Sequence, residues 1–225
     1  MKEYNLSRSK IELYLQCPCC FYNDVKRNIK RPPGFPFSIN NAVDVLLKRE
    51  FDLYRDLGKA HPLQAPLGLI PATHPQLQSW RNAKSGVSYL HPQHQCRYYG
   101  AIDDLWFNPQ QNTYHVVDYK ATAKIEAVTE LPSWTDSYKR QIEFYQWLLR
   151  HNGLAISNTA YFLYCTGDPT KSTFDGMMYF RQHVIAYEGQ TNWIEPMLDE
   201  LQACYAHPNP PAANKSCVYC AYKNA

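Results

Sequence analysis

The sequence lacks the long apolar segments that mark membrane-spanning or secreted proteins. No run approaches the roughly 20 apolar residues that a membrane span needs, and the N-terminal segment MKEYNLSRSK has no apolar stretch typical of a signal peptide. We therefore expect a soluble, cytoplasmic protein with no membrane partner. The sequence also lacks a strong excess of either charge. Its net charge of +3 permits a nucleic-acid partner without arguing for one.

The composition is that of a folded protein. Hydrophobic residues make up 45% of the chain and charged residues 19%, which excludes a disordered chain. At 225 residues the chain is long enough for one domain with a full core, and short for two. We therefore predict a single domain over residues 1–225; nothing in the sequence indicates its oligomeric state.

A polar segment, Asn108–Asn112, separates two runs rich in β-branched and aromatic residues. This pattern predicts a β-hairpin over residues 97–120. Side chains two apart on a strand share a face, which groups Asp118 with Lys120. A turn symmetric about residues 110 and 111 places Asp103 opposite Asp118 on that face. Asp104 then points to the other face, where we expect a structural or solvent-facing role.

The facing carboxylates of Asp103 and Asp118 predict a cation site. Two like charges directly across a strand pair repel each other. Their neighbours in both runs are apolar, so a charge without a partner is costly there. A divalent cation between the two carboxylates removes the conflict, and Lys120 beside them suits an anionic substrate. The alternative, a solvated strand face with ordinary surface charges, does not explain why both acids lie in apolar runs.

Helical spacing of apolar residues predicts a helix from Ser38 to Gly58, and another that is capped by Ser133 or Asp136 and closed by residues 152–153. Runs of β-branched and aromatic residues predict strands over residues 159–165 and 176–187. Shorter helices are expected within residues 76–90 and 191–205. This succession favours an α/β sandwich. The apolar stripe expected on the first of these helices comprises Ile39, Val43, Leu46, Leu47, Phe51 and Tyr54.

Gln141 and Tyr145 lie four residues apart in the helix that begins near Asp136, so they share one helix face. That face is otherwise apolar, and a glutamine in such a stripe needs hydrogen-bond partners. One interpretation is a local hydrogen bond at the rim of the core. The other is an orienting role at a site that the helix covers.

Cysteines form the second constellation. Cys17 and Cys20 make one CxxC pair, and Cys217 and Cys220 make another at the opposite end of the chain. In a reducing compartment two such pairs favour a four-thiolate metal site over disulfides. Zinc and iron–sulfur clusters both accept four thiolates. Cys19 is a competing ligand, whereas buried, unreactive positions are expected for Cys96, Cys165 and Cys204.

A basic stretch follows the first cysteine pair. Its side chains are suited to contact phosphates while neighbouring aromatic rings stack on bases. A solvated connector is an equally good interpretation. The stretch comprises Lys26, Arg27, Lys30 and Arg31, beside the aromatic residues Phe21 and Tyr22.

The order of these motifs resembles the PD-(D/E)XK nuclease superfamily, and within it the RecB-like branch of CRISPR-associated exonucleases and AddB nuclease domains. The resemblance runs from Ser7-x-Ser9 and Cys17-Pro18 to the terminal cysteine pair. Its central motifs are Gly100-Ala-Ile-Asp103, Val116-Val117-Asp118-Tyr119-Lys120 and Gln141-x-x-x-Tyr145. Each motif alone is weak evidence for this resemblance, whereas the ordered set of motifs is fairly specific for the superfamily.

The resemblance implies a fold and a set of site residues. The fold is α/β, with a restriction-endonuclease-like core, a central mixed sheet flanked by helices, and chain ends joined by the four-cysteine metal site. Residues 1–35 and 207–225 then form a cysteine metal-binding subregion of one domain. Asp103 and Asp118 become ligands of Mg²⁺ or Mn²⁺, Lys120 the catalytic lysine, and Gln141 and Tyr145 supporting residues.

The sequence departs from the branch at two places. Asp44 stands where a helix histidine is expected, and as a hard oxygen ligand it is a candidate third metal ligand; a solvated carboxylate on the helix flank is the alternative. The branch carries a [4Fe-4S] cluster held by one cysteine before the core and three after it. This chain has two and two, which makes zinc an alternative; on the resemblance alone we expect the cluster first.

The implied function is metal-dependent hydrolysis of phosphodiester bonds in DNA, with single strands or duplex ends as partners. An exonuclease of DNA repair, recombination or CRISPR-type processing fits the branch. Two alternatives stay open. One is a binding module that keeps the fold without turnover, and the other is a metal-thiolate interaction protein whose hairpin acids are incidental.

Overall fold

The computed structural model describes residues 4–34, 38–133 and 135–223, with side chains up to residue 220. The chain forms two compact units. The first comprises Met1–Phe35, Ser88–Gly100 and Thr191–Ala225, and the second comprises Pro36–Val87 and Ala101–Gln190. The predicted cysteine subregion falls in the first unit and the hairpin acids fall in the second. The assignment of all residues to one domain stays a prediction.

The second unit is built on a mixed five-stranded sheet with the strand order β2-β5-β6-β7-β8. The strands are β2 (Ile70–Pro71), β5 (Asp104–Asn108), β6 (Thr113–Ala123), β7 (Thr159–Gly167) and β8 (Phe180–Glu188). Neighbours are antiparallel except β6 and β7, which run parallel. A parallel pair needs a crossover, and helix α5 (Asp136–His151) supplies it.

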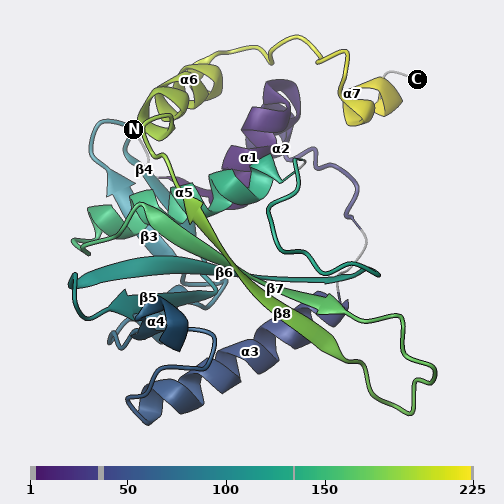
Figure 1. The fold of residues 1–225 in the computed structure, drawn as a ribbon. Helices are drawn as coiled ribbons and strands as arrows, with labels where there is room; N and C mark the ends of the chain where they lie inside the picture. Colours follow the sequence, from purple (N-terminus) through teal and green to yellow (C-terminus); the bar gives the residue numbers. More distant parts are fainter. Residues whose placement is uncertain (1–3, 35–37, 134, 224–225) are drawn as a thin grey trace. The chain divides into compact units, whose positions relative to one another are not determined.

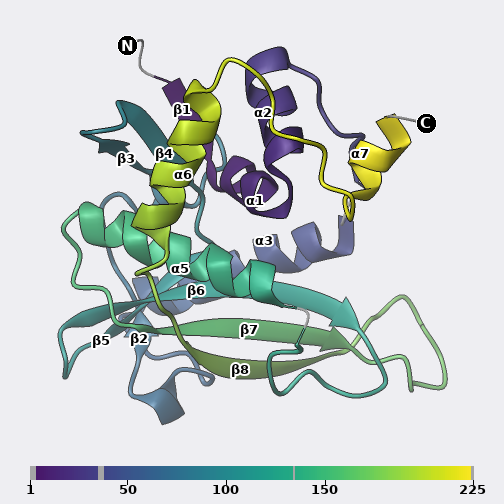
Figure 2. The same cartoon turned by 90° about the horizontal axis from the view of Figure 1, so that it is seen from above.

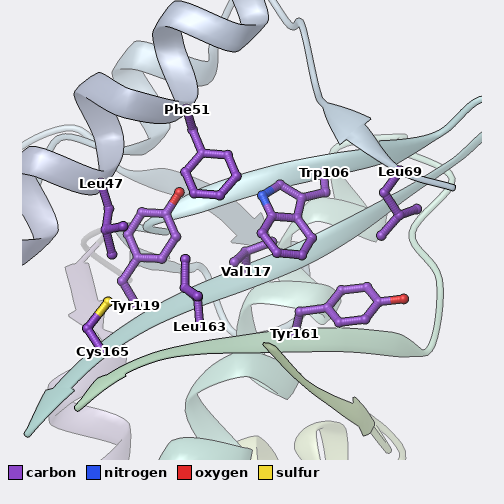
Figure 3. Close-up of a cluster of buried hydrophobic side chains, with 9 residues drawn as sticks. All are labelled: Leu47, Phe51, Leu69, Trp106, Val117, Tyr119, Tyr161, Leu163 and Cys165. Carbon is purple, nitrogen blue, oxygen red and sulfur yellow. The ribbon is translucent and has the colours of Figure 1, made fainter. Parts of the chain in front are cut away.

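Helices cover both faces of this sheet. Helix α3 (Ser38–Asp56) lies on one face and α5 on the other (Figures 1 and 2). Under α3 the core is aromatic, and Figure 3 shows Phe51 beside Trp106 and Tyr119. The Phe51 ring centroid lies 5.5 Å from that of Trp106 and 5.9 Å from that of Tyr119. Together with α5, this arrangement confirms the predicted α/β core with a central mixed sheet flanked by helices.

Several local predictions need correction. Of the apolar stripe expected on α3, Leu47 and Phe51 are buried, whereas Ile39 and Leu46 are 58% and 60% exposed. Helix α5 begins at Asp136 with Thr135 as its N-cap, so neither Ser133 nor Asp136 is the cap. Residues 76–90 contain only the one-turn helix α4 (Leu77–Trp80), because Gly86 turns the chain with a φ of 59° and a strand follows. Residues 59–76, whose prolines and lack of periodicity predict an irregular loop, hold a 3₁₀ turn, η1 (Ala65–Leu67), and strand β2.

The first unit combines a small sheet with helices from both ends of the chain. Its three strands have the order β1-β4-β3, with β1 (Tyr4–Ser7) parallel to β4 (Cys96–Gly100). The other elements are β3 (Val87–His91), α1 (Arg8–Gln16), α2 (Pro18–Arg27), α6 (Ile194–Ala206) and α7 (Val218–Lys223). The Tyr22 hydroxyl donates to the carbonyls of His207 and Pro208 at 3.0 and 2.7 Å, which ties α2 to the segment after α6.

No helix in the described part of the chain combines the length and the apolar character required to cross a membrane.

Candidate active site and cysteine site

The β5–β6 hairpin has the predicted register. Asp104 pairs with Val117 and Asn108 with Thr113, so the ladder is symmetric about residues 110 and 111. The Asn108 side chain shapes the turn by accepting hydrogen bonds from the backbone N–H groups of residues 110 and 111, at 3.0 and 3.1 Å. Extended by one residue, this register sets Asp103 against Asp118, as predicted.

Asp103 stands just before β5, at the end of the ladder. Its Oδ2 accepts a hydrogen bond of 2.8 Å from the backbone N–H of Tyr119, and its Oδ1 lies 3.7 Å from the Lys48 ammonium. Burial and the nearby Asp118 carboxylate raise the pKa of Asp103 to about 7, against the opposing pull of Lys120 and Lys48. This carboxylate therefore carries a charge that its own surroundings do not fully balance.

Helix α3 brings two further charged groups to Asp103. Lys48 Nζ lies 2.8 Å from Asp44 Oδ2, so the lysine lies between the carboxylates of Asp44 and Asp103. Asp44 Oδ1 is buried and has no hydrogen-bond partner among the described residues. Asp44 thus lies at the predicted site and offers a free acceptor to a cation. Its role as a metal ligand stays a prediction.

Asp118 is held from two sides on β6. It is 1% exposed, it forms an ion pair with Lys120, and its Oδ1 accepts a hydrogen bond of 3.0 Å from the Gln141 side chain of α5. Gln141 also lies 3.5 Å from the Tyr145 hydroxyl, whereas the Lys120 ammonium lies 4.6 Å from the ring centroid of Tyr138. The structure therefore gathers every predicted member of the site in one unit.

Three contributors were not predicted. Lys48 is visible in the sequence only as the i+4 neighbour of Asp44, which says nothing of its proximity to Asp103. Tyr138 lies three residues before Gln141 in α5, and its ring faces the Lys120 ammonium. Tyr164 is the register partner of Lys120 on β7, and its hydroxyl is buried without a hydrogen-bond partner among the described residues. Burial, with smaller contributions from Tyr138 and Asp118, raises the pKa of Tyr164.

Asp104, next in sequence to Asp103, has a different environment. It is fully buried, so its structural role is confirmed and the solvent-facing alternative was wrong. Its carboxylate pairs with Arg55 at 2.7 Å and with Arg81, and accepts a hydrogen bond of 2.8 Å from the Tyr119 hydroxyl. Asp104, in the core, is therefore fully partnered, whereas Asp103, at the predicted site, is not.

The four cysteines of the two CxxC pairs meet in the first unit. Their sulfurs all lie within 4.8 Å of one another. The Sγ–Sγ distances are 3.5 Å for Cys17 to Cys220, and 3.7 and 3.6 Å from Cys20 to Cys217 and Cys220. Among the described residues, no other three cysteine, histidine or carboxylate ligand atoms lie this close together, so Asp44, Asp103 and Asp118 do not form such a compact group.

The neighbouring thiols are separate from this cluster. Cys19 accepts a hydrogen bond from the Asn23 side chain at 3.5 Å and is not part of the four-sulfur group. Cys96 and Cys165 are buried as expected, whereas Cys204 is only partly buried. The four sulfurs at the two chain ends therefore form a group that can hold a metal.

The aromatic residues next to the basic stretch are not available for stacking. Phe21 is fully buried and Tyr22 is 3% exposed, so the prediction that they stack on bases was wrong. The basic side chains of Lys26, Arg27 and Lys30 are exposed, whereas Arg31 is half-buried. Arg31 Nη2 donates to Cys217 Sγ at 3.4 Å, which sets a positive charge beside the four thiols.

Comparisons with known proteins agree with this geometry. No curated protein sequence matches the chain. A family model, the PD-(D/E)XK nuclease superfamily, matches residues 38–225, which include the hairpin acids, Lys120, the α5 pair and the second CxxC. With the acids and the lysine on one mixed α/β sheet, this match shows that the chain belongs to the PD-(D/E)XK nuclease superfamily.

Proposed function

We propose that this protein is a Mg²⁺- or Mn²⁺-dependent deoxyribonuclease. The observation that carries the proposal is the pairing of Asp103 with Asp118, beside Lys120, on the site face of the hairpin. The raised pKa of Asp103 and the free oxygen of Asp44 support a cation at this place. Mg²⁺ binds to a few carboxylates together with waters and phosphate oxygens, which suits an open group of acids.

Each side chain has a role that follows from its contacts. Asp103 and Asp118 are the proposed ligands, with Asp44 as a third, and a bound ion supplies positive charge to the phosphate and acidifies a water. Lys120 places an ammonium beside Asp118, where it stabilises negative charge that develops on the phosphate. Gln141 fixes the orientation of the Asp118 carboxylate through its 3.0 Å hydrogen bond.

The resemblance to the RecB-like branch adds the finer part of the proposal. It supports an exonuclease that acts on single-stranded DNA or on duplex ends, in DNA repair, recombination or CRISPR-type processing. Tyr145 belongs to the same motif as Gln141, and its hydroxyl lies within 3.5 Å of that amide. We therefore assign Tyr145 to support of Gln141.

The spacing of the four sulfurs supports a single metal ion in the cysteine site. Zinc–sulfur bonds of about 2.3 Å place the corners of a tetrahedron about 3.8 Å apart, close to the three distances of 3.5–3.7 Å. A [4Fe-4S] cluster sets four irons and four sulfides between the thiolates and requires a wider group. We therefore propose structural zinc here, in place of the cluster that the resemblance implies.

The activity test is cleavage of labelled single- and double-stranded DNA with Mn²⁺ or Mg²⁺. Wild-type protein is expected to cleave, Lys120→Ala to lose most of the activity, and Lys59→Ala, an exposed lysine beyond the end of α3, to behave as wild type. Shortening of end-labelled DNA from its ends distinguishes an exonuclease from an endonuclease. Binding without cleavage by the wild type would indicate the inactive module, and equal cleavage by Lys120→Ala would refute the role of this lysine.

The cysteine site has its own test. Anaerobically purified protein is expected to contain about one zinc per chain and no broad absorbance near ~400 nm, because a d¹⁰ ion has no such band. Cys217→Ser should lose the metal. Iron and sulfide with visible absorbance would establish the cluster instead. Unchanged metal content in Cys217→Ser would refute the four-cysteine site altogether.

A further inference from the structure

A cavity of about 450 Å³ opens beside the cysteine site in the first unit. Residues from the two ends of the chain line it, from α2 and the segment after it on one side and from the segment leading into α7 on the other. Two of the clustered cysteines, Cys20 and Cys220, form part of its wall. The volume is within the range of sites that bind small molecules or one unit of a polymer.

The lining of the cavity is positively charged. Arg27, Lys30 and Arg31 contribute to it, and none of the described residues that line it carries a carboxylate. Asp24, the acidic residue of α2, forms an ion pair of 2.5 Å with Lys10. The exposed side chains of Arg27 and Lys30 therefore remain available to an anion. Paired guanidinium and ammonium groups of this kind suit phosphate oxygens.

An aromatic surface completes the cavity. Tyr219 lines it and is 40% exposed, in contrast to the buried aromatic rings of α2. The Arg31 guanidinium lies 4.4 Å from the ring centroid of Tyr219. Arg31 also donates to Gln16 at 2.9 Å and to Cys217 Sγ at 3.4 Å, so the stacked pair is held in place. Aromatic and guanidinium planes are the surfaces on which unpaired bases stack.

We propose that this cavity binds a nucleotide unit of single-stranded DNA, with phosphates at Arg27 and Lys30 and a base against Tyr219. The inference rests on the proposed function, because a DNA substrate is its premise. A single strand fits better than a duplex, since stacking on Tyr219 requires a base that is free of its own neighbours. The proposal also links binding of the DNA strand to the cysteine site, because Cys217 and Cys220 anchor the segment that carries Tyr219.

The test measures binding of a fluorescent oligothymidylate of about 12 nucleotides by anisotropy, without Mg²⁺ or Mn²⁺ so that no cleavage occurs. Combined Arg27→Ala and Lys30→Ala substitution is expected to weaken binding and to lower the slope of log Kd against log salt by about 1.4, because each single-strand phosphate contact contributes about 0.7. Lys59→Ala is the matched control and should bind as wild type. An unchanged affinity and salt slope in the double variant would overturn the proposal.

The aromatic contribution is tested separately. Tyr219→Ala should weaken binding by about 5- to 150-fold with an unchanged salt slope, the range expected for loss of one base–aromatic stack. Tyr219→Phe keeps the ring and should retain wild-type affinity. Because Tyr219 adjoins Cys220, metal content is measured in both variants. Loss of binding in Tyr219→Phe with metal retained, or equal affinity of the wild type for a duplex of the same length, would refute the stacking assignment.

The cleavage assay separates failure of this inference from failure of the proposed function. If the wild type cleaves DNA, the Arg27 and Lys30 double variant should raise KM with kcat unchanged, because the cavity contributes binding alone. Cleavage with an unchanged KM and unchanged binding refutes the cavity and leaves the nuclease. Binding that depends on the cavity in a wild type that never cleaves refutes the nuclease and leaves the cavity.

Discussion

Replacement of Asp103 by asparagine is expected to stabilise the metal-free protein above neutral pH. The side chain keeps an oxygen that accepts the Tyr119 N–H, and it loses the charge that conflicts with Asp118. The asparagine is nearly isosteric, so the substitution isolates the charge. If replacing a site residue makes the metal-free protein more stable, the residue is kept for binding a ligand and not for the stability of the fold.

The magnitude follows from the pKa of Asp103. A rise from 3.8 to about 7 on folding sets a ceiling of about 4 kcal/mol on the stability that the wild type loses. Because 23% of the side chain is exposed, solvent screening lowers the effect, and we expect about 2 kcal/mol. The raised pKa stabilises the folded state below pH 4, and this contribution is lost as the pH rises through 7. The advantage of Asp103→Asn should therefore be small near pH 4, grow between pH 4 and pH 7, and be full at pH 8.

The assay is denaturant unfolding of both proteins at pH 4 and pH 8, with and without Mg²⁺. The adjacent substitution, Asp104→Asn, is the matched control, because this acid pairs with Arg55 and Arg81 in the core. It should destabilise the protein by about 3–5 kcal/mol. Addition of Mg²⁺ at pH 8 should stabilise the wild type more than Asp103→Asn. Equal destabilisation by both substitutions, or an Asp103→Asn effect that does not change with pH, would refute the reasoning.

Three further substitutions test the surroundings of the acids. Lys48→Met should tighten Mn²⁺ binding several-fold in calorimetry, because its ammonium lies between two proposed ligands; weaker binding would contradict this. Gln141→Leu should lower metal affinity by about 10- to 100-fold, as expected when a partner of a ligand is lost, and unchanged affinity would show that Asp118 needs no such support. Tyr164→Phe should leave the free energy of unfolding unchanged or higher by about 1 kcal/mol, since its hydroxyl is buried without a partner in the described chain; a clear loss of stability would reveal a partner.

The hairpin and its register were predictable because their causes are local. Asn108 begins a turn of four residues, and an alternating pattern on each side fixes which side chains face each other. From that register the pairing of Asp103 with Asp118 follows directly. Helix α5 was predictable for a similar reason, since its apolar spacing and the stop at Gly153, with a φ of 85°, are both encoded nearby.

Features that depend on tertiary pairing were not predictable. Strand β2 is two residues long in a proline-rich segment, and it exists because Ile70 and Pro71 pair with β5. Strand β3 lies where a helical pattern was expected, and its place in the sheet beside β4 decides its conformation. The proximity of Lys48 to Asp103 likewise depends on how α3 packs on the sheet. A charged residue in an amphipathic helix indicates only that its side chain lies outside the apolar core. The local sequence therefore does not reveal which strand Lys48 approaches.

The contrast between the two neighbouring acids explains how the fold tolerates an unbalanced site. Tyr119 contacts both: its backbone N–H donates to Asp103 and its hydroxyl donates to Asp104, each at 2.8 Å. On the core face, Arg55 and Arg81 complete the partners of Asp104 and hold the start of β5 in place. That fixed strand keeps Asp103 opposite Asp118 in spite of their repulsion. The ion pairs and the hydrogen bond of Asp104 in the core therefore help to keep Asp103 and Asp118, the two acids that a metal is expected to bind, next to each other.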